Sequence, residues 1–346
     1  NAQVIAAPRL MRPNQMYPMN LEVAETVVEN YEGGKDANGM YSGEGTATFR
    51  NGHSYKGMWS EGLMHGNGLF TWADGVSYRG PMVQGKISGR GQIKWPGGNA
   101  YDGFVVDGFR HGNGKFVMVM ESEEVEDESA VITYEGEWKF GKRHGEGVLL
   151  YDSDGKQKYE GEWCNDARHG FGTMTYRSGN VYKGEWKDGQ LHGQGQMMWY
   201  HKNEIYVGGW QNGLQHGKGE HVWLIEVQSG TAFQTMNRYV GEWQNGVRHG
   251  TGVFEYADGS RYEGEWAANV KEGTGTFNFP DGSCYKGKFS KDKMLGQHKR
   301  PTKTTINPGA AEVVLHINDL LSEQDNAEAE LVKVKNLIVQ YMSELK

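Results

Sequence analysis

The chain has few of the residues that mark several common protein classes. Its two cysteines, Cys164 and Cys284, are too far apart for a metal or redox motif and predict free thiols in a reducing compartment. No apolar run approaches the roughly 18 residues of a transmembrane helix, and no segment has the make-up of a secretory signal. The net charge is −8, without a basic cluster, which argues against a nucleic-acid footprint or attraction to an anionic membrane.

The motifs of common catalytic sites are absent as well. No Gly-Lys-Ser/Thr occurs, and the Gly-x-Gly pairs are followed by no helix pattern, so they lack the context of a phosphate-binding loop. There is no Gly-x-Ser-x-Gly elbow. Carboxylate pairs such as Glu135 and Glu137 recur, and a solvated polar face explains them without a catalytic pocket. We therefore expect no enzyme activity and no cofactor.

Glycine is abundant instead, at 52 of 346 residues, without a collagen-like triplet period. The glycines belong to a phrase that repeats along the chain: Tyr-x-Gly-x-Trp, a short turn, His-Gly-x-Gly, an apolar pair and Asp-Gly. The first tyrosines of the copies are Tyr31, Tyr55, Tyr78, Tyr101, Tyr134, Tyr159, Tyr182, Tyr206, Tyr239, Tyr262 and Tyr285. Most steps are 23 to 25 residues, and a fixed period of this size predicts an array of identical small units.

Each copy is predicted to be a β-hairpin. Residues two apart share a face of an extended strand, so Tyr134, Gly136 and Trp138 point the same way. A glycine on that face leaves room for an aromatic ring from the neighbouring strand. Dipeptides such as Asn212-Gly213 supply the positive φ that tight turns need. The expected fold is an all-β repeat array: an elongated, single-layer antiparallel meander of hairpins with one aromatic and one polar face.

The aromatic residues of the central copies are expected to form rows along one face of this sheet. They are Tyr134, Trp138, Tyr159, Trp163, Tyr182, Trp186, Tyr206, Trp210, Tyr239, Trp243, Tyr262 and Trp266. Because the sheet has a single layer, we expect this aromatic surface and the two strand edges to be exposed and to favour the binding of partners.

Breaks in the repeat divide the chain into regions. We predict an N-terminal extension at 1–30, an array of about 10–11 copies at 31–298, a linker at 299–309 and an amphipathic helix at 310–346. Insertions interrupt the array near 117–133 and near 224–238. The first contains the acidic run Glu121–Glu128, which suits a solvated loop or a docking loop for a basic partner. The second carries apolar residues that suit a partner contact or packing on the array itself.

The C-terminal segment has the spacing of a coiled-coil-like helix, with apolar residues in steps of three and four and a weaker centre at Gln324 and Ala327. The predicted partner-binding seam consists of Val313, Ile317, Leu320, Leu331, Val334, Ile338, Tyr341 and Leu345. It either joins the chain to another helix, in a homo- or hetero-assembly, or packs on the chain's own sheet. We favour the first, because the linker holds the helix clear of the last hairpin.

Seven histidines recur in the second half of the phrase: His65, His111, His144, His169, His192, His216 and His249. Equivalent positions in stacked hairpins are two strands apart, roughly 9–10 Å, whereas the ligands of one zinc ion lie within about 4 Å of each other. We therefore expect turn histidines that hydrogen-bond the backbone, and no metal site.

The phrase Tyr-x-Gly-x-Trp-x-x-Gly-x-x-His-Gly-x-Gly resembles the repeat of the MORN family, from roughly Tyr31 to Phe289. The stretches Met58–Gly68, Thr71–Gly75, Trp199–Tyr206 and 221–238 are further similar to MORN-repeat subunits of the radial spoke head of motile cilia. The pattern departs at Pro81 and Val83, where the family has strand residues and an aromatic residue, and in the weak copies at Tyr31 and Tyr101.

The resemblance implies a non-catalytic structural protein of the ciliary or flagellar axoneme, a part of the cytoskeleton that drives cell motility, with other radial spoke head proteins as partners. Two other classes stay open. A membrane-junction or lipid-associated tether, as other MORN arrays resemble, would be expected to show a basic face or an anchor, and neither is visible. A regulatory array of an enzyme requires a catalytic domain, and too few residues lie outside the array to form one.

Overall fold

The computed structural model describes residues 27–120, 130–223 and 237–296. Two compact units divide the chain: Asn1–Pro280 with Tyr285–Gly296, and Asp281–Cys284 with Gln297–Lys346. The described part of the first unit is built from β-strands that belong to one 23-stranded sheet. The single 3₁₀ turn η1 (Tyr200–Lys202) is the only helical element among the described residues.

The strands are short and follow one another with tight connections. They are β1 (Val28–Lys35), β2 (Tyr41–Phe49), β3 (Ser54–Ser60), β4 (Leu63–Thr71), β5 (Ser77–Val83), β6 (Lys86–Ile87), β7 (Gly89–Lys94), β8 (Ala100–Val106), β9 (Phe109–Met120), β10 (Ala130–Lys139), β11 (Lys142–Leu150), β12 (Lys158–Cys164), β13 (Ala167–Thr175), β14 (Val181–Lys187), β15 (Gln190–Trp199), β16 (Glu204–Gln211), β17 (Leu214–Trp223), β18 (Asn237–Gln244), β19 (Val247–Glu255), β20 (Arg261–Ala267), β21 (Val270–Asn278), β22 (Cys284–Ser290) and β23 (Lys293–Leu295).

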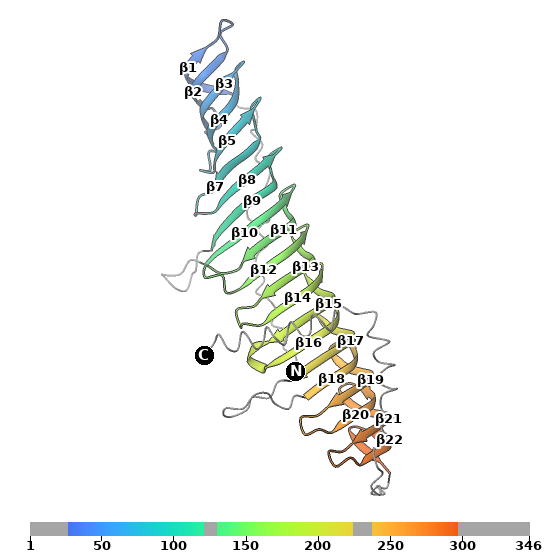
Figure 1. Cartoon of the computed structure of the whole chain (residues 1–346). Helices are drawn as coiled ribbons and strands as arrows, with labels where there is room; N and C mark the ends of the chain where they lie inside the picture. The colour runs from blue at the N-terminus through green and yellow to red at the C-terminus, as the bar shows by residue number, and fades with distance from the viewer. Residues whose placement is uncertain (1–26, 121–129, 224–236, 297–346) are drawn as a thin grey trace. The chain divides into compact units, whose positions relative to one another are not determined.

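Strands that are neighbours in the chain are also neighbours in the sheet (Figure 1). The first strand of a copy pairs antiparallel with the second, as β10 does with β11, and the second pairs with the first strand of the next copy, as β11 does with β12. The short β6 departs from this order, because β5 pairs with both β6 and β7. The predicted all-β antiparallel meander is confirmed.

The hairpins share a β-bulge. In β10–β11, Gly136 is opposite Gly147, but the next residue on the same face, Trp138, is opposite Arg143. The same register shift occurs in the hairpins β3–β4, β12–β13, β14–β15, β16–β17, β18–β19 and β20–β21. Gly145, inside the bulge, has a φ of 54°, a left-handed conformation that favours glycine.

Two-residue turns close the hairpins, as the sequence predicts. In the turn between β16 and β17, Asn212 has a φ of 52° and Gly213 a φ of 80°, which are the positive angles that this kind of turn requires. Phe140 takes the corresponding place in the turn between β10 and β11, with a φ of 47°. A bulky side chain is disfavoured in that conformation.

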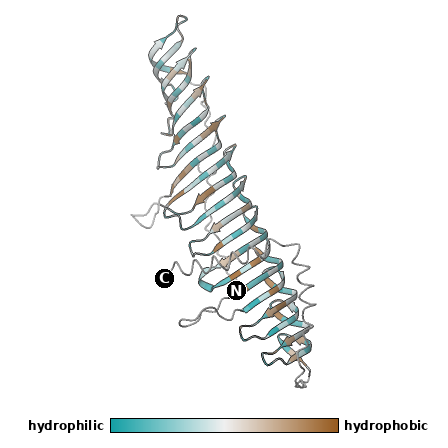
Figure 2. Cartoon of the chain, in the orientation of Figure 1, coloured by the Kyte–Doolittle hydropathy of each residue, from teal (hydrophilic) through white to brown (hydrophobic). Residues whose placement is uncertain are grey.

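Polar and apolar residues alternate along the strands (Figure 2), so the sheet has an aromatic face, which carries the tyrosines and tryptophans of the repeat, and a polar face. β9 and β10 extend to Met120 and from Ala130, so the ends of the expected insertion at 117–133 are strand residues. The acidic run, most of the second insertion and the predicted linker and helix lie outside the described residues.

Candidate functional site

The twelve tyrosines and tryptophans expected to line one face do share that face, but they are buried. Each is at most 6% exposed, and Tyr159, Tyr182 and Tyr206 are fully buried. The expectation of an exposed aromatic surface is therefore wrong. The rings of successive copies cover one another, so these rows form the core of the sheet.

Each tyrosine lies over a pair of glycines. A Cβ atom added at Gly136 would come within 2.7 Å of the Tyr134 hydroxyl, and one at Gly147 within 2.6 Å of a carbon of the same ring. The Tyr134 hydroxyl donates to the Glu137 carbonyl at 3.0 Å, and the equivalent bond recurs in the copies from Tyr55 to Tyr285. The predicted role of glycine, to make room for a ring, is confirmed.

Burial raises the pKa of the tyrosine hydroxyls. The pKa of Tyr55, Tyr78 and Tyr262 rises to about 12, and the pKa of Tyr134 and Tyr182 rises further. The main cause is that a phenolate loses its hydration when it is buried. The hydroxyls are therefore neutral hydrogen-bond donors at physiological pH, and they support the fold rather than reaction chemistry.

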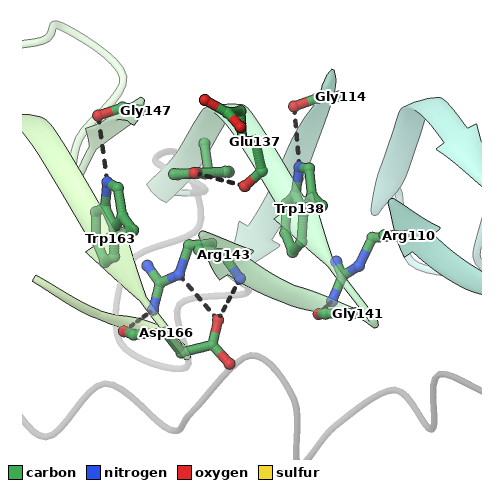
Figure 3. A network of polar contacts seen from close by, with 10 residues as sticks. Arg110, Gly114, Glu137, Trp138, Gly141, Arg143, Gly147, Trp163 and Asp166 are labelled. Carbon is green, nitrogen blue, oxygen red and sulfur yellow. Dashed lines mark hydrogen bonds and ion pairs between the residues drawn. The ribbon is translucent and has the colours of Figure 1, made fainter. Parts of the chain in front are cut away.

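In most copies a tryptophan packs against the copy before it. Trp163 packs edge-on against Tyr159 of its own copy, at 5.1 Å between ring centroids, and against Tyr134 of the preceding copy, at 5.5 Å. Its indole Nε1 donates to the carbonyl of Gly147 at 3.2 Å (Figure 3). Because these contacts cross the boundary between copies, each copy stabilises its neighbours.

Arginines add a layer that the sequence reasoning missed. The guanidinium carbon of Arg143 lies 4.2 Å from the centre of the Trp163 ring, and its Nε is 3.2 Å from an Asp166 carboxylate oxygen (Figure 3). Arg168 stacks in the same way on Trp186 at 4.2 Å. A cation over an indole face is favourable. Hydrogen bonds to the next copy hold these arginines in place. In the sequence they could have been recognised as the Arg that precedes His-Gly in some copies.

The third and fourth copies have no tryptophan at this position. Met82 and Val105 take its place on the aromatic face, and both are buried. The loss of an aromatic residue that we expected at Val83 therefore lies one position earlier, at Met82. Since successive residues of a strand point to opposite faces, Val83 belongs to the polar face, where its side chain is 48% exposed.

Glutamates on the polar face accept hydrogen bonds from the backbone. The Glu162 carboxylate accepts the backbone N–H of Phe171 at 2.7 Å, and Glu185 accepts that of Gln194 at 2.7 Å. Glu137, Glu242 and Glu265 make the same bond in their own hairpins. Each of these glutamates therefore satisfies an amide that the bulge frees from the strand pairing. The plain solvated face inferred for Glu137 is thus incomplete.

The repeat histidines behave differently from the expectation. His144 belongs to strand β11 rather than to a turn, and the buried Nδ1 atoms of His111, His144 and His216 have no hydrogen-bond partner in the described part of the chain. The predicted bond from imidazole to backbone is wrong for these three, because strand amides nearby already pair across the sheet. No group of three possible metal ligands occurs in residues 27–120, 130–223 or 237–296.

One histidine outside the repeat phrase lies in the core. His221 is 6% exposed. It is opposite the tyrosine of its own hairpin, where neighbouring copies have Met197 and Phe254. Its ring stacks on Trp223 at 4.0 Å between centroids. Its Nε2 lies 3.4 Å from a carboxylate oxygen of Glu204. No pattern in the sequence indicates this pair, because the two residues meet only when β16 and β17 are aligned.

The sheet thus consists of similar hairpins, joined by contacts among tyrosines, tryptophans and arginines. A family model, MORN repeat, matches ten segments of the chain, which are residues 31–54, 55–77, 78–100, 101–120, 134–156, 159–181, 182–200, 206–223, 239–261 and 262–284. These segments cover more than half of the sequence.

The chain belongs to the MORN repeat family. MORN repeats form non-catalytic scaffolds for interaction with proteins or membranes, and the family is not known for catalysis. The matched segments end at 284, before the expected copy at Tyr285. There the hairpin is short, because β23 has three residues where β21 has nine.

Two further sequence features can be placed against the structure. Among the residues described, no helix is both long enough and apolar enough to span a membrane. The seam from Val313 to Leu345 lies outside the described residues, so its role as a partner-binding helix stays a prediction.

Proposed function

We propose that the chain is a structural scaffold of the axonemal radial spoke head, similar to the radial spoke head protein 10 homologue of motile cilia, and that it has no catalytic activity. The observation that supports this best is the use of the aromatic face. Tyrosine, tryptophan and arginine layers fill it and join one copy to the next, so the polar face and the ends of the sheet are the surfaces left for other proteins.

The assignment to the spoke head rests on sequence similarity in Met58–Gly68, Thr71–Gly75 and Trp199–Tyr206. Under this proposal the protein resides in the axoneme of cilia and flagella, and its partners are other radial spoke head proteins. It acts by holding them at fixed spacings, which follow from the repeat period.

The test is fractionation of motile cilia. We expect the chain to stay with axonemes after detergent has removed the membrane, and to be lost from axonemes that lack radial spokes. Release of the chain with the membrane fraction would contradict the proposal and support the lipid-associated tether instead. Liposome flotation with anionic lipids gives a second reading, in which the scaffold is expected to stay in the soluble fraction at physiological salt, because no cluster of four to eight basic residues is present.

The predicted C-terminal helix is proposed as a second contact with partners. Its seam from Val313 to Leu345 would be about 48 Å long at 1.5 Å per residue. If it joins chains, cutting at Pro308 should halve the mass measured by light scattering or release a co-purifying protein, while the array keeps its melting temperature. A lower melting temperature without a change in assembly would show that the segment packs on its own sheet.

A further inference from the structure

In the described hairpins from β1–β2 to β20–β21, the residue opposite the repeat tyrosine is apolar with one exception. The apolar residues are Ala47, Phe70, Ile93, Phe116, Leu149, Met174, Met197, Phe254 and Phe277. In the hairpin of β16 and β17 this position holds His221, which is 6% exposed. Burying a polar ring has a cost that an apolar side chain avoids, so packing alone does not explain a histidine here.

Three indole rings stack around the imidazole. Trp223, on the same strand, lies 4.0 Å from His221 between ring centroids, at an interplanar angle of 6°. Trp199 on β15 and Trp243 on β18 lie 5.5 Å and 5.8 Å away, at 18° and 29°. The face of an indole attracts a cation, so these rings favour the charged imidazolium over the neutral imidazole.

A carboxylate is in contact with the same ring. An oxygen of Glu204 lies 3.4 Å from Nε2 of His221, and neither ring nitrogen has a hydrogen-bond partner in the described part of the chain. A proton on the imidazole turns this contact into an ion pair next to the core. Glu220, the residue before His221, points to the opposite face, where it pairs with Arg238 at 2.7 Å.

Other titratable groups face the ring from the neighbouring strands. Tyr206 on β16 and Tyr239 on β18 stand opposite the imidazole, and burial raises the pKa of both hydroxyls, so they are neutral. Arg248, on β19, is positive but lies over Trp223, 5.9 Å from the centre of that ring. Burial itself disfavours a charged imidazole, whereas the groups in contact with the ring, a carboxylate and three indole faces, favour it.

We propose that His221 is a proton-sensitive joint of the array. In mildly acidic solution the imidazolium pairs with Glu204 and stacks on the indoles, and it holds β16 and β17 to the neighbouring strands. As the pH rises through the range from about 5 to 8 in which an imidazole loses its proton, the ion pair is lost and the joint loosens. The stabilisation by the charged form is thus present at the acidic end of this range and absent at the alkaline end.

The effect should stay local, because each copy contacts only its neighbours. It should reach the strands that touch His221 or its indoles, which are β15 to β19, and leave the copies over β2–β8 unchanged. This inference goes beyond the proposed scaffold role and does not depend on it, since it concerns the array in solution. The two can therefore fail separately.

The first experiment measures hydrogen exchange of the full-length chain at pH 5.5 and pH 7.5. Between these values carboxylates stay ionised, and tyrosines and arginines keep their protons, so histidines account for most of the change. After correction for intrinsic exchange rates, we expect the amides of β15–β19 to be about tenfold better protected at pH 5.5. Equal protection at the two values, or weaker protection at pH 5.5, would overturn the proposal.

The second experiment assigns the effect to the pair. His221→Phe installs the residue found at Phe254 and should make the protection of β15–β19 equal at the two pH values. Glu204→Gln keeps the size of the side chain without its charge and should remove most of the difference, and it serves alone if the first variant does not fold. A full pH difference that persists in a folded variant would refute the role of the pair.

The matched control is His169→Gln, because His169 is an exposed repeat histidine on β13. It should leave the pH difference of β15–β19 as it is, and loss of the difference there would show that the effect does not come from His221. A direct readout is the magnetic resonance signal of isotopically labelled histidine rings, in which the His221 signal is identified by its absence from His221→Phe. A His221 signal that does not titrate between pH 5 and pH 8 in the folded chain would also overturn the proposal.

Discussion

The copies over β3–β9 and those over β10–β21 build the same hairpin with different residues on its two faces. Most later copies carry a tryptophan on the aromatic face, such as Trp163, and a glutamate on the polar face, such as Glu162. The second copy also has a buried tryptophan, Trp59, but Met58 takes the place of the glutamate. In the fourth copy Val105 and Phe104 hold these two places. The buried position accepts any apolar side chain that fills its space, whereas the exposed position can be changed without losing the hairpin.

Both regions share the tyrosine that lies over two glycines. The Tyr101 hydroxyl donates to the Phe104 carbonyl at 2.9 Å, as in the later copies, and Gly103 is still opposite Gly114 under the Tyr101 ring. The tyrosine over two glycines therefore defines the hairpin. Tryptophan, arginine and glutamate add stability around it.

Replacing Gly193 and Gly195 by valine should have the largest effect. A Cβ atom at Gly195 would lie 2.6 Å from a carbon of the Tyr182 ring, and Gly193 has a φ of 55°, so both changes collide with the fold or strain it. We expect β14 and β15 to lose their protection in hydrogen exchange. The change Gly114→Val should be as severe in the early copies, and tolerance there would show that the two regions do not share a core.

Trp186→Ala should cost roughly 3–5 kcal/mol of unfolding free energy. The ring is 3% exposed, contacts Tyr159 and Tyr182, and carries Arg168 on its face. Hydrogen exchange should show the damage in the copies that start at Tyr159, Tyr182 and Tyr206. Trp186→Met, which imitates the third copy, should recover part of the loss. Uniform loosening of all copies would indicate a closed globular core instead of a row of units.

Alkaline pH should destabilise the array through its tyrosines. The unfolded chain ionises its tyrosines near pH 10, whereas burial raises the pKa of Tyr55 and Tyr78 to about 12. The stabilisation is thus complete below pH 10 and is lost as the pH rises toward 12, at about 1.4 kcal/mol per pH unit for each such tyrosine.

Individual copies should differ in this titration, because the pKa of Tyr101, Tyr159 and Tyr206 is raised further than that of Tyr55 and Tyr262. The difference does not follow the division into early and later copies. Near-ultraviolet absorbance and circular dichroism, followed together, should show the phenolates of these buried tyrosines appearing only as the sheet unfolds. Ionisation of all 18 tyrosines near pH 10 with an intact sheet would mean that the repeat hydroxyls are not buried.

Exchanging the residues of the polar face should have the smallest effect. Glu185→Met removes the acceptor of the Gln194 N–H and should cost about 1 kcal/mol. The reverse change, Met58→Glu, supplies such an acceptor and should leave stability equal or slightly higher. Urea denaturation of the two variants measures both. A large loss from Met58→Glu would mean that the early copies depend on the exposed Met58 side chain for stability, and the comparison between the regions would fail.

Local sequence patterns were enough to predict the hairpins. The Tyr-x-Gly spacing, the Asn-Gly turns and the alternation of faces act over a few residues, so they determine the strands and their order. The family resemblance has the same origin, because the repeat phrase consists of the residues that a single hairpin needs. The loss of the aromatic residue in the third copy was predicted at Val83, but it lies one position earlier, at Met82. The residues around Pro81 depart from the repeat pattern, so the sequence does not show which of them point to the aromatic face.

Only the tertiary structure decided which surfaces are free. Trp163 becomes buried because Tyr134 and Arg143 of the preceding copy meet it across the sheet, and a pattern within one copy cannot show this. Glu162 reaches the Phe171 amide because the bulge shifts the register by a fixed amount. The sequence by itself determined a row of hairpins with an aromatic and a polar face. Contacts between residues about 20 positions apart make the aromatic face the core and leave the polar face as the exposed surface.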